Sequence, residues 1–575
     1  MSYNVLGVNP GHNGSAALIV DGKVECYIEE ERLSRAKYDG NPFKAMNYIL
    51  SKWRVDHLVI VGTTDNLPKL PWNNEDPYYC LVRKYYPKAK LSYLGNYHHL
   101  CHASTAFFNS GFDKAFALII DGAGSFITHN DDKNNIIFQG YETESIFLCE
   151  RPNNIICFFK AIGNNYGYSY KNGFFDFDNA ANLTKVYEAV TDYLGFPFIE
   201  AGKTMGLAPY GKHNDNIPPL FYKNKGGKDL FIPSYPAGAM VNSVVFEQFQ
   251  REHNPQDWHD DPSRLTDIEK DLAYHVQQET QLLVSNYIDF IIKNTDIRNI
   301  ILSGGYALNC VTNYFLIKKY PELNFYVEPI SHDGGTSIGG ATKVWQDIYV
   351  ELSQTDEIFD PTPRQTTIYY GIKYEDYELN KILEENSKRI EIKNVECNEV
   401  AKLISDKNIV SIFQGRSEAG PRALGNRSIL YDPRDPHGKE VVNVVKGREW
   451  FRPFAGSCLV EDAKDWFDLG SLDESPFMMY AVNVIADKID QIPNIVHVDG
   501  TCRVQTVSEE QNKHFYNLIK SFKSITGIPI LFNTSFNLAG DPLVETLQDA
   551  LDTLYRSELK YLYLPELGKL VTKLD

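Results

Sequence analysis

The chain has 575 residues, more than one hydrophobic core organises, so two or three domains are expected. Its formal net charge of -18 argues against an unspecific nucleic-acid binder and against a protein that coats an anionic membrane. No basic, apolar leader begins the chain, no apolar run approaches the roughly 20 residues of a membrane span, and scattered cysteines without a Cys-x-x-Cys pair favour the reducing cytoplasm.

The N-terminal residues predict a strand at 4–9, a turn at 10–14 and a returning strand at 15–20. Asp21-Gly22 is typical of a two-residue hairpin turn, and it leads into a third strand at 23–29. A glycine-containing turn between paired strands can hold phosphate through main-chain N–H groups, although most such turns only connect strands.

A second unit of the same kind lies at residues 115–125. Residues 115–120 predict a buried strand, and Asp121, Gly122 and Gly124 form the turn behind it. An aspartate at a strand end suits a metal–phosphate group, while an aspartate that stabilises its own turn explains the pattern equally well. Two such hairpins indicate a duplicated nucleotide-binding architecture.

A histidine pair lies between these hairpins, on a helix predicted at 98–108. His98 and His102 are four residues apart, so both imidazoles share a face and can bind one metal, provided that a third ligand exists. Asp333 is the candidate, because it follows a strand predicted at 324–327 and precedes a glycine-rich helix start. Two histidines and one carboxylate suit iron(II) or a similar divalent ion. The adjacent His332 is expected to point away.

Two more glycine-rich stretches are candidate nucleotide contacts. Residues 300–309 predict a strand, a turn with Gly304 and Gly305, and a helix start at which Asn309 could bind a sugar or base. Residues 203–211, which include Gly206, predict a compact loop, with a tight packing corner as the alternative. A helix is predicted at 182–194, and the long amphipathic pattern at 266–293 is interpreted as core scaffold.

A polar stretch at 353–366, without periodicity and with two prolines, predicts a linker between domains at 1–352 and 367–575. Helices are predicted at 377–387 and 398–405, followed by a buried strand at 409–413. Residues 414–430 then place Arg416, Arg422 and Arg427 among glycines, where guanidinium groups could bind phosphate or carboxylate oxygens in pairs. The alternative is an exposed basic loop.

Further cations follow in the same domain. So many positive groups would repel one another unless bound anions compensated them, and a polyphosphate with a second phosphorylated substrate would do so. The alternative is that some of them, Arg434 and Arg448 above all, form surface salt bridges. A strand at 528–532 ends in polar residues suited to hydroxyl and amide contacts. The predicted anion-binding residues here are Lys446, Arg452, Arg503, Asn533 and Ser535.

Together these motifs resemble the O-carbamoyltransferase family that includes the nodulation and cephalosporin enzymes and an aminoglycoside carbamoyltransferase. The resemblance covers nearly the whole chain, in blocks that keep the family's order. They lie at 29–32, 98–103, 205–211, 333–341, 415–430, 446–454 and 533–537.

The resemblance implies an α/β protein with an N-terminal domain of the actin and sugar-kinase superfamily and a C-terminal domain similar to threonylcarbamoyl-AMP synthase. It implies that carbamoyl phosphate and Mg-ATP give carbamoyl-adenylate in the C-terminal domain. The adenylate then meets a metal in the N-terminal domain, where an acceptor hydroxyl attacks the carbamoyl carbon.

Residue by residue, the resemblance implies a carbamoyl-phosphate site at Lys446, Arg452, Arg503 and Ser535, and iron-type ligands at His98, His102 and Asp333. It implies an adenylate site at Asp121, Gly122, Gly304, Gly305 and Asn309, to which we add Gly124 and Gly206. His12 is the expected general base. Relatives often have His-Asp where this chain has His12-Asn13, and an asparagine cannot act as a base.

The acceptor is left open. A sugar or antibiotic hydroxyl is the first interpretation, and a hydroxymethylated pyrimidine, in a nucleotide or DNA, is the second. Basic and aromatic residues at 84–90 and 158–175 favour the latter, whereas the net charge does not. Carbamoyl transfer to protein or tRNA, and a regulatory nucleotide-binding module without transfer chemistry, are the alternative functions. A homodimer is compatible with the sequence.

Overall fold

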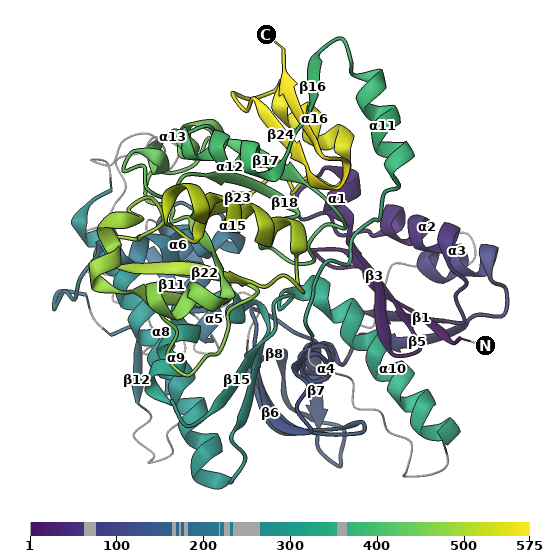
Figure 1. Cartoon of the computed structure of the whole chain (residues 1–575). Coiled ribbons are helices and arrows are strands. Elements are labelled where there is room, and N and C mark those ends of the chain that lie inside the picture. The colour runs from purple at the N-terminus through teal and green to yellow at the C-terminus, as the bar shows by residue number, and fades with distance from the viewer. Residues whose placement is uncertain are drawn as a thin grey trace. The chain divides into compact units, whose positions relative to one another are not determined.

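Figure 1 shows the chain as a computed structural model. The structure describes residues 2–62, 76–163, 168–171, 174–177, 182–217, 219–223, 231–233, 265–353 and 365–574. One compact unit consists of Met1–Val24 and Asn41–Gln365, and the other of Glu25–Gly40 and Thr366–Asp575. The second unit thus includes an early segment that the predicted division at 353–366 assigns to the first domain. Most of that predicted linker lies outside the described residues.

The first unit contains two sheets that share a pattern of strand pairing. The strands are β1 (Asn4–Asn9), β2 (Ser15–Val20), β3 (Lys23–Glu29), β4 (His57–Val61) and β5 (Lys90–Leu94) in one sheet, and β6 (Lys114–Ile120), β7 (Phe126–Asn130), β8 (Ile136–Glu150), β9 (Asn154–Gly163), β14 (Asn299–Ser303) and β15 (Asn324–Val327) in the other. In one sheet β1 pairs antiparallel with β2 and parallel with β4, which pairs parallel with β5. In the other, β6 pairs antiparallel with β8 and parallel with β14, which pairs parallel with β15. This repetition confirms the duplicated α/β architecture.

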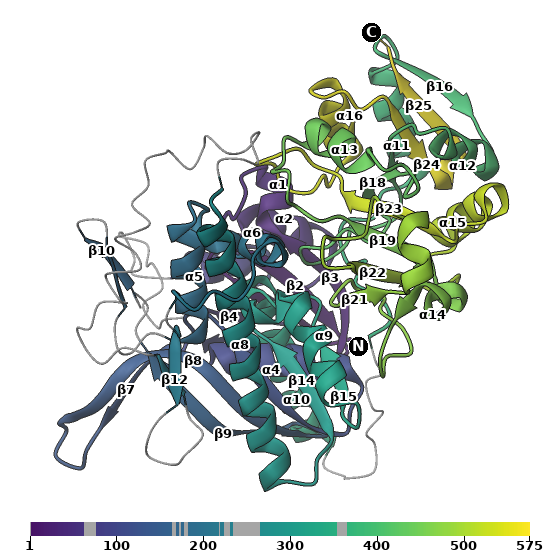
Figure 2. The same cartoon turned by 90° about the vertical axis from the view of Figure 1, so that its left-hand side faces the viewer.

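The hairpins follow the predicted turn chemistry. Asp21 and Gly22 both have positive φ, 47° and 83°, as a two-residue turn between twisted strands requires. The third strand, β3, begins in the first unit and continues into the second after Val24. Figure 2 shows the long antiparallel ribbon of β7, β8 and β9. Short hairpins are formed by β10 (Tyr168–Lys171) with β11 (Phe174–Phe177), and by β12 (Phe221–Lys223) with β13 (Phe231–Pro233).

Two helices fill the space between the sheets. The helices of this unit are α2 (Phe43–Lys52), α3 (Pro77–Tyr85), α4 (His98–Ser110), α5 (Leu183–Tyr193), α6 (Gly202–Leu207), α8 (Asp267–Asn294), α9 (Cys310–Lys319) and α10 (Thr336–Ser353), with short 3-10 turns η1 (Phe198–Glu200), η2 (Ala208–Tyr210), η5 (Gly305–Leu308) and η6 (Asp333–Gly335). Helix α10 packs on β1, β2 and β4, α4 packs on β6 and β14, and the two helices pack on each other. A Cβ at Gly339 would lie 1.9 Å from the Cys101 carbonyl oxygen, so glycine permits this close approach.

The helices predicted at 98–108, 182–194 and 266–293 are confirmed as α4, α5 and α8. The compact loop predicted at 203–211 is wrong, because most of these residues form α6 and η2. The small side chains allow the segment to pack on α8 as a helix, with Leu207 and Ala208 buried. Among the described residues, no helix is long and apolar enough to cross a membrane.

The second unit is built on one mixed sheet. Its strands are β16 (Ile390–Asn394), β17 (Val410–Phe413), β18 (Arg427–Tyr431), β19 (Ala455–Leu459), β20 (Phe467–Asp468), β21 (Ala481–Val484), β22 (Thr501–Val507), β23 (Ile530–Ser535), β24 (Tyr561–Leu564) and β25 (Lys569–Lys573). The order is β16-β25-β24-β17-β18-β23-β19-β22-β21-β20. β17 runs parallel to β24 and β19 parallel to β22, so the sheet is mixed.

Helices and short turns complete this unit: α1 (Glu30–Ser34), α11 (Asp376–Glu385), α12 (Cys397–Ser405), α13 (Gly438–Lys446), α14 (Ala463–Trp466), α15 (Lys513–Thr526) and α16 (Leu547–Tyr555), with η7 (Val460–Asp462), η8 (Ala486–Gln491) and η9 (Pro565–Leu567). A core cluster joins α11 and α16 to the sheet through Leu383, Leu551, Ile429 and Leu562. The helices predicted at 377–387 and 398–405 are confirmed as α11 and α12. Helix α13 was not predicted, because its four valines are β-branched and favour a strand in isolation.

Candidate active site

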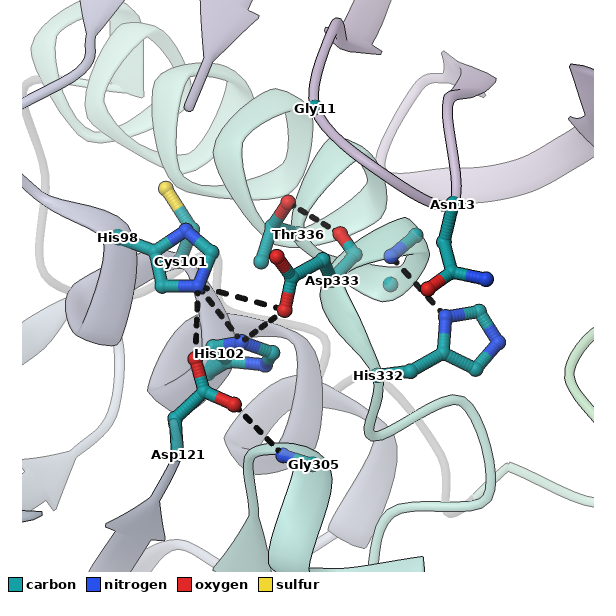
Figure 3. Close-up of polar contacts among 12 residues, drawn as sticks. Gly11, Asn13, His98, Cys101, His102, Asp121, Gly305, His332, Asp333 and Thr336 are labelled. Atoms are coloured by element: carbon teal, nitrogen blue, oxygen red, sulfur yellow. Dashed lines mark hydrogen bonds and ion pairs between the residues drawn. The ribbon is translucent and has the colours of Figure 1, made fainter. Parts of the chain in front are cut away.

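Four side chains converge in the first unit, as Figure 3 shows. His98 and His102 project from α4, Asp121 follows β6, and Asp333 begins the turn before α10. All four are buried, and one ligand atom from each lies within 4.8 Å of the other three. The packing of α4 on α10 and on β6 therefore brings together residues more than 200 positions apart in the chain.

The ligand atoms of this cluster lie close enough together to hold one metal ion. The two imidazole Nε2 atoms of His98 and His102 are 3.1 Å apart. His98 Nε2 lies 3.3 Å from an Asp121 oxygen and 3.6 Å from an Asp333 oxygen, which is itself 3.8 Å from His102 Nε2. Ligands about 2.1 Å from one tetrahedral ion would be about 3.4 Å apart, so this set of donors fits a divalent metal.

Electrostatics link the same residues. Burial disfavours charge on His98, but the carboxylates of Asp333 and Asp121 outweigh it and raise the pKa of His98 to about 10. The carboxyl groups are buried as well, yet the facing histidines hold the pKa values of Asp121 and Asp333 below their usual range. A divalent cation would be bound by the deprotonated forms of these side chains.

Two more histidines lie around Asp333. His12, in the turn after β1, has its Nε2 atom 3.5 Å from an Asp333 oxygen, and its side chain is 57% exposed. His332 instead uses Nδ1 to accept a hydrogen bond of 3.0 Å from the Gly334 N–H, and its ring faces away from the cluster in Figure 3. His12 is thus the histidine near the cluster that an incoming molecule could reach.

The glycine turns beside the cluster serve different purposes. The Gly305 N–H donates to Asp121 Oδ1 over 3.1 Å, so the turn after β14 orients that carboxylate. Gly304 has φ of 87°, and a Cβ there would lie 2.4 Å from the Ile120 carbonyl oxygen. Gly122 and Gly124 lie in the turn after β6, and Gly206 is buried in α6.

Asn309, predicted to bind a sugar or base, has a structural role in the described contacts. Its side-chain oxygen accepts from the Thr312 N–H and caps α9. Its amide nitrogen donates to Gln277 Oε1 over 2.9 Å, and the residue is buried. The hydrogen-bonding capacity of this side chain is therefore largely used within the protein.

In the second unit, Lys446 is the most unusual cation. Its ammonium group is buried and donates to the Ser535 carbonyl oxygen, to Ser535 Oγ over 3.2 Å and to Asn537 Oδ1 over 3.0 Å. Burial, together with Arg448 and Arg452 nearby, holds the pKa of Lys446 well below its ordinary value. Lys446, Arg452 and Ser535 are thus brought into one neighbourhood. Asn537 was not singled out, although it ends the same polar motif.

Two of the three arginines in the 414–430 stretch do not fit the predicted anion site. The guanidinium group of Arg416 donates to the carbonyl oxygens of Glu25, Tyr370 and Gly371. Arg427 is fully buried, stacks 3.7 Å from the centre of the Phe413 ring, and donates to carbonyl oxygens of the surrounding loops. These groups hold main chain in place. The sequence shows that these arginines are charged, but it does not show which main-chain carbonyl oxygens lie beside them in the fold. Their structural role could therefore not be predicted.

The remaining predicted residues of this unit have varied surroundings. Arg422 is half-buried, and Arg452 forms a weak ion pair of 3.9 Å with Glu449. Arg503 lies in β22, opposite Ala455 of β19. The Asn533 amide nitrogen is buried and donates to Ala423, Ser457 and Gln505. Arg434 pairs with Asp432 over 2.6 Å, as the salt-bridge alternative predicts.

Comparisons with known proteins match both units. The family model for the carbamoyltransferase N-terminus matches residues 82–342, and the model for the carbamoyltransferase C-terminus matches residues 401–571. The chain is 30% identical to nodulation protein NolNO of Sinorhizobium fredii, covering 95% of this chain and 77% of that protein. It is 31% identical to nodulation protein NolO of Bradyrhizobium diazoefficiens, covering 80% and 76%.

Similarity to solved structures is low. A crystal structure of full-length HypF in the phosphate- and nucleotide-bound form is 11% identical over 60% of this chain and 56% of that one, with a TM-score of 0.34. A TM-score of this size establishes no shared fold.

Proposed function

The chain belongs to the carbamoyltransferase family, and from this premise we propose that it transfers a carbamoyl group to an acceptor hydroxyl at the expense of ATP. The observation that supports this most is the buried convergence of His98, His102, Asp121 and Asp333 at the end of the duplicated sheets. Such a donor set, with a reachable histidine beside it, suits a metal-assisted group transfer.

In the proposed first step, the second unit forms carbamoyl-adenylate. Carbamoyl phosphate, ATP and water give carbamoyl-adenylate, pyrophosphate and phosphate. Lys446, Arg452, Arg503 and Ser535 bind the phosphate groups and offset their charge, with Arg422 as a further contact. The amide nitrogen of the carbamoyl group stabilises its carbonyl, so activation as a mixed anhydride with AMP supplies the leaving group that transfer needs.

In the proposed second step, the first unit passes the carbamoyl group to the acceptor. A divalent ion such as iron(II), held by His98, His102, Asp333 and Asp121, would polarise and orient the adenylate. Gly122, Gly124 and Gly304, in the turns beside Asp121, are the proposed contacts of the adenylate. His12 takes the proton of the acceptor hydroxyl, the new C–O bond forms, and AMP leaves.

Product-resolved kinetics test this proposal. Purified protein is incubated with ATP and carbamoyl phosphate, and pyrophosphate and AMP are measured separately. We expect pyrophosphate release that depends on carbamoyl phosphate, and AMP release that rises when an acceptor is added. No carbamoyl-phosphate-dependent release would favour a regulatory nucleotide-binding protein instead.

A panel of candidate acceptors tests which hydroxyl receives the carbamoyl group. We propose a sugar or antibiotic-type hydroxyl, the acceptor that the resemblance to the O-carbamoyltransferase family implies. Hydroxymethylated pyrimidine nucleotides and DNA, protein and tRNA complete the panel as alternatives. We place the reaction in the cytoplasm, the setting that the scattered cysteines predict.

A further inference from the structure

The position of α4 decides whether the histidine pair can meet Asp121, and this helix lacks a cap of its own. Its N-cap residue is Tyr97, which makes no side-chain capping bond, and its first turn contains no acidic residue. The first N–H groups of a helix need acceptors, so other elements must supply them. Two side chains from outside the helix do so here, and both also contact the turn that carries Asp121.

Glu142 is the first of these side chains. Its Oε2 atom accepts from the His99 N–H over 3.3 Å and from the Ser125 N–H over 3.0 Å. The His99 N–H belongs to the first turn of α4, and the Ser125 N–H closes the turn that begins at Asp121. Its second oxygen pairs with Lys160 of β9. One fully buried carboxylate therefore joins the two elements that carry His98 and Asp121.

Ser125 provides the other side chain. Its hydroxyl accepts from the His98 N–H over 3.0 Å and donates to the Gly95 carbonyl oxygen over 2.8 Å. The main chain adds to this arrangement, because Gly124 N–H donates to the Glu142 carbonyl and Glu142 N–H to the Ser125 carbonyl. The main-chain bonds would survive a change of the Glu142 side chain, so substitution isolates what the carboxylate does.

The second ring nitrogen of His98 is not held by a hydrogen bond among the described residues. Metal-bound histidines usually donate from their second ring nitrogen to an acceptor, which fixes the ring. His98 Nδ1 is buried and has no hydrogen-bond partner among the described residues. The placement of the helix itself must then set the position of the ring.

We infer that Glu142 is a positioning residue of the transfer site: its carboxylate clamps the start of α4 to the turn after β6 and thereby sets the separation of His98 from Asp121. This inference rests on the proposed function, since it assumes that the cluster binds a metal. β8 delivers the side chain at an irregularity, where its register with β9 shifts between Glu142 and Ser145. Such bulges re-aim side chains near functional sites.

Metal binding provides the main test. The variant is Glu142→Gln, which retains one acceptor oxygen and turns an NH2 group toward either Lys160 or the two N–H groups. The matched control is Glu328→Gln, because Glu328 is equally buried and accepts from Ile330 N–H, from Tyr326 and from Asn109 at the C-terminal end of α4, none of which belongs to the cluster or to the first turn of α4. Cobalt(II), whose visible absorption reports its coordination, is titrated into each metal-free protein.

We expect Glu142→Gln to bind cobalt(II) about 10- to 100-fold more weakly than wild type, with an altered spectrum, as for other residues behind metal ligands. Glu328→Gln should bind within twofold of wild type. Ser125→Ala removes the other bridge and should weaken binding in the same direction. Equal affinities for Glu142→Gln and Glu328→Gln would overturn the inference.

Hydrogen exchange separates failure of this inference from failure of the proposed function. If wild type binds no cobalt(II), the metal part of the proposed function is wrong, and the clamp is judged by exchange alone. Peptides that contain His99 and Ser125 should then exchange at least tenfold faster in Glu142→Gln than in Glu328→Gln. Identical exchange in the two variants would show that the carboxylate holds nothing in place.

Discussion

The histidine–aspartate cluster of the first unit and the arginine-rich stretch of the other unit share a sequence character, since both collect charged residues among glycines, yet the structure uses them differently. In the cluster, imidazole nitrogens and carboxylate oxygens face one another at 3.1 to 3.8 Å. In the stretch, Arg416 and Arg427 face carbonyl oxygens of their own unit. A high density of charged residues in the sequence therefore identifies a candidate site. Whether a given residue binds a ligand or supports the fold depends on the atoms that its charged group contacts.

The largest effect is expected for Asp333→Asn. It keeps the size of the side chain and removes a charged ligand, so carbamoyl transfer should fall at least about a thousandfold, the scale of losing an essential electrostatic contact in a transition state. Pyrophosphate release from the second unit should stay within about threefold of wild type. Loss of both activities to the same degree would show that the two steps are not divided between the units.

Arg427→Met tests whether the arginine-rich stretch supports the fold. The substitution leaves several buried carbonyl oxygens without a donor, so the free energy of unfolding should fall by about 3 kcal/mol or more, measured by urea denaturation. Arg422→Met is the matched control in the same loop. It should cost less stability than Arg427→Met and instead raise the KM for carbamoyl phosphate. A reversal of these two outcomes would return Arg427 to the anion site.

Some features of the fold and of the site could be predicted from the sequence, and others could not. The duplicated hairpins, α4 and α8 were predictable because their signals are local: alternation, turn residues and helical spacing. His98, His102 and Asp333 could be proposed as one set from helical spacing and a strand end, and the family resemblance implies the same set. Asp121 joined them only when β6 and α4 were packed together. The use of Arg427, the helical form of 203–211 and the clamp at Glu142 depend on contacts between distant residues, which no local pattern records.

The buried side chain of Glu144 leads to a prediction of how the stability of the fold depends on pH. Burial raises the pKa of Glu144 from 4.5 to about 7. Between these values the unfolded state loses the proton while the folded state keeps it, so the residue destabilises the fold increasingly as pH rises to 7, by about 3 kcal/mol in all. Glu144→Gln should remove this slope and be more stable than wild type at pH 8. Unfolding curves at pH 4.5 and pH 8 that shift equally in both proteins would contradict the assignment.

The smallest effect is expected for Asn309→Ala. Loss of the cap on α9 should cost about 1 kcal/mol of stability. Because the amide is bound to Gln277, the KM for ATP should change less than about threefold. A tenfold or larger increase in that KM, with stability unchanged, would restore Asn309 to the predicted adenylate site.

The central claim is that the second unit makes an activated carbamoyl-adenylate before any acceptor is present. Isotope exchange between labelled pyrophosphate and ATP measures this directly on the wild-type chain. We predict exchange that requires carbamoyl phosphate, persists in Asp333→Asn and disappears in Lys446→Met. Exchange that is absent from wild type, or that continues undiminished in Lys446→Met, would contradict it.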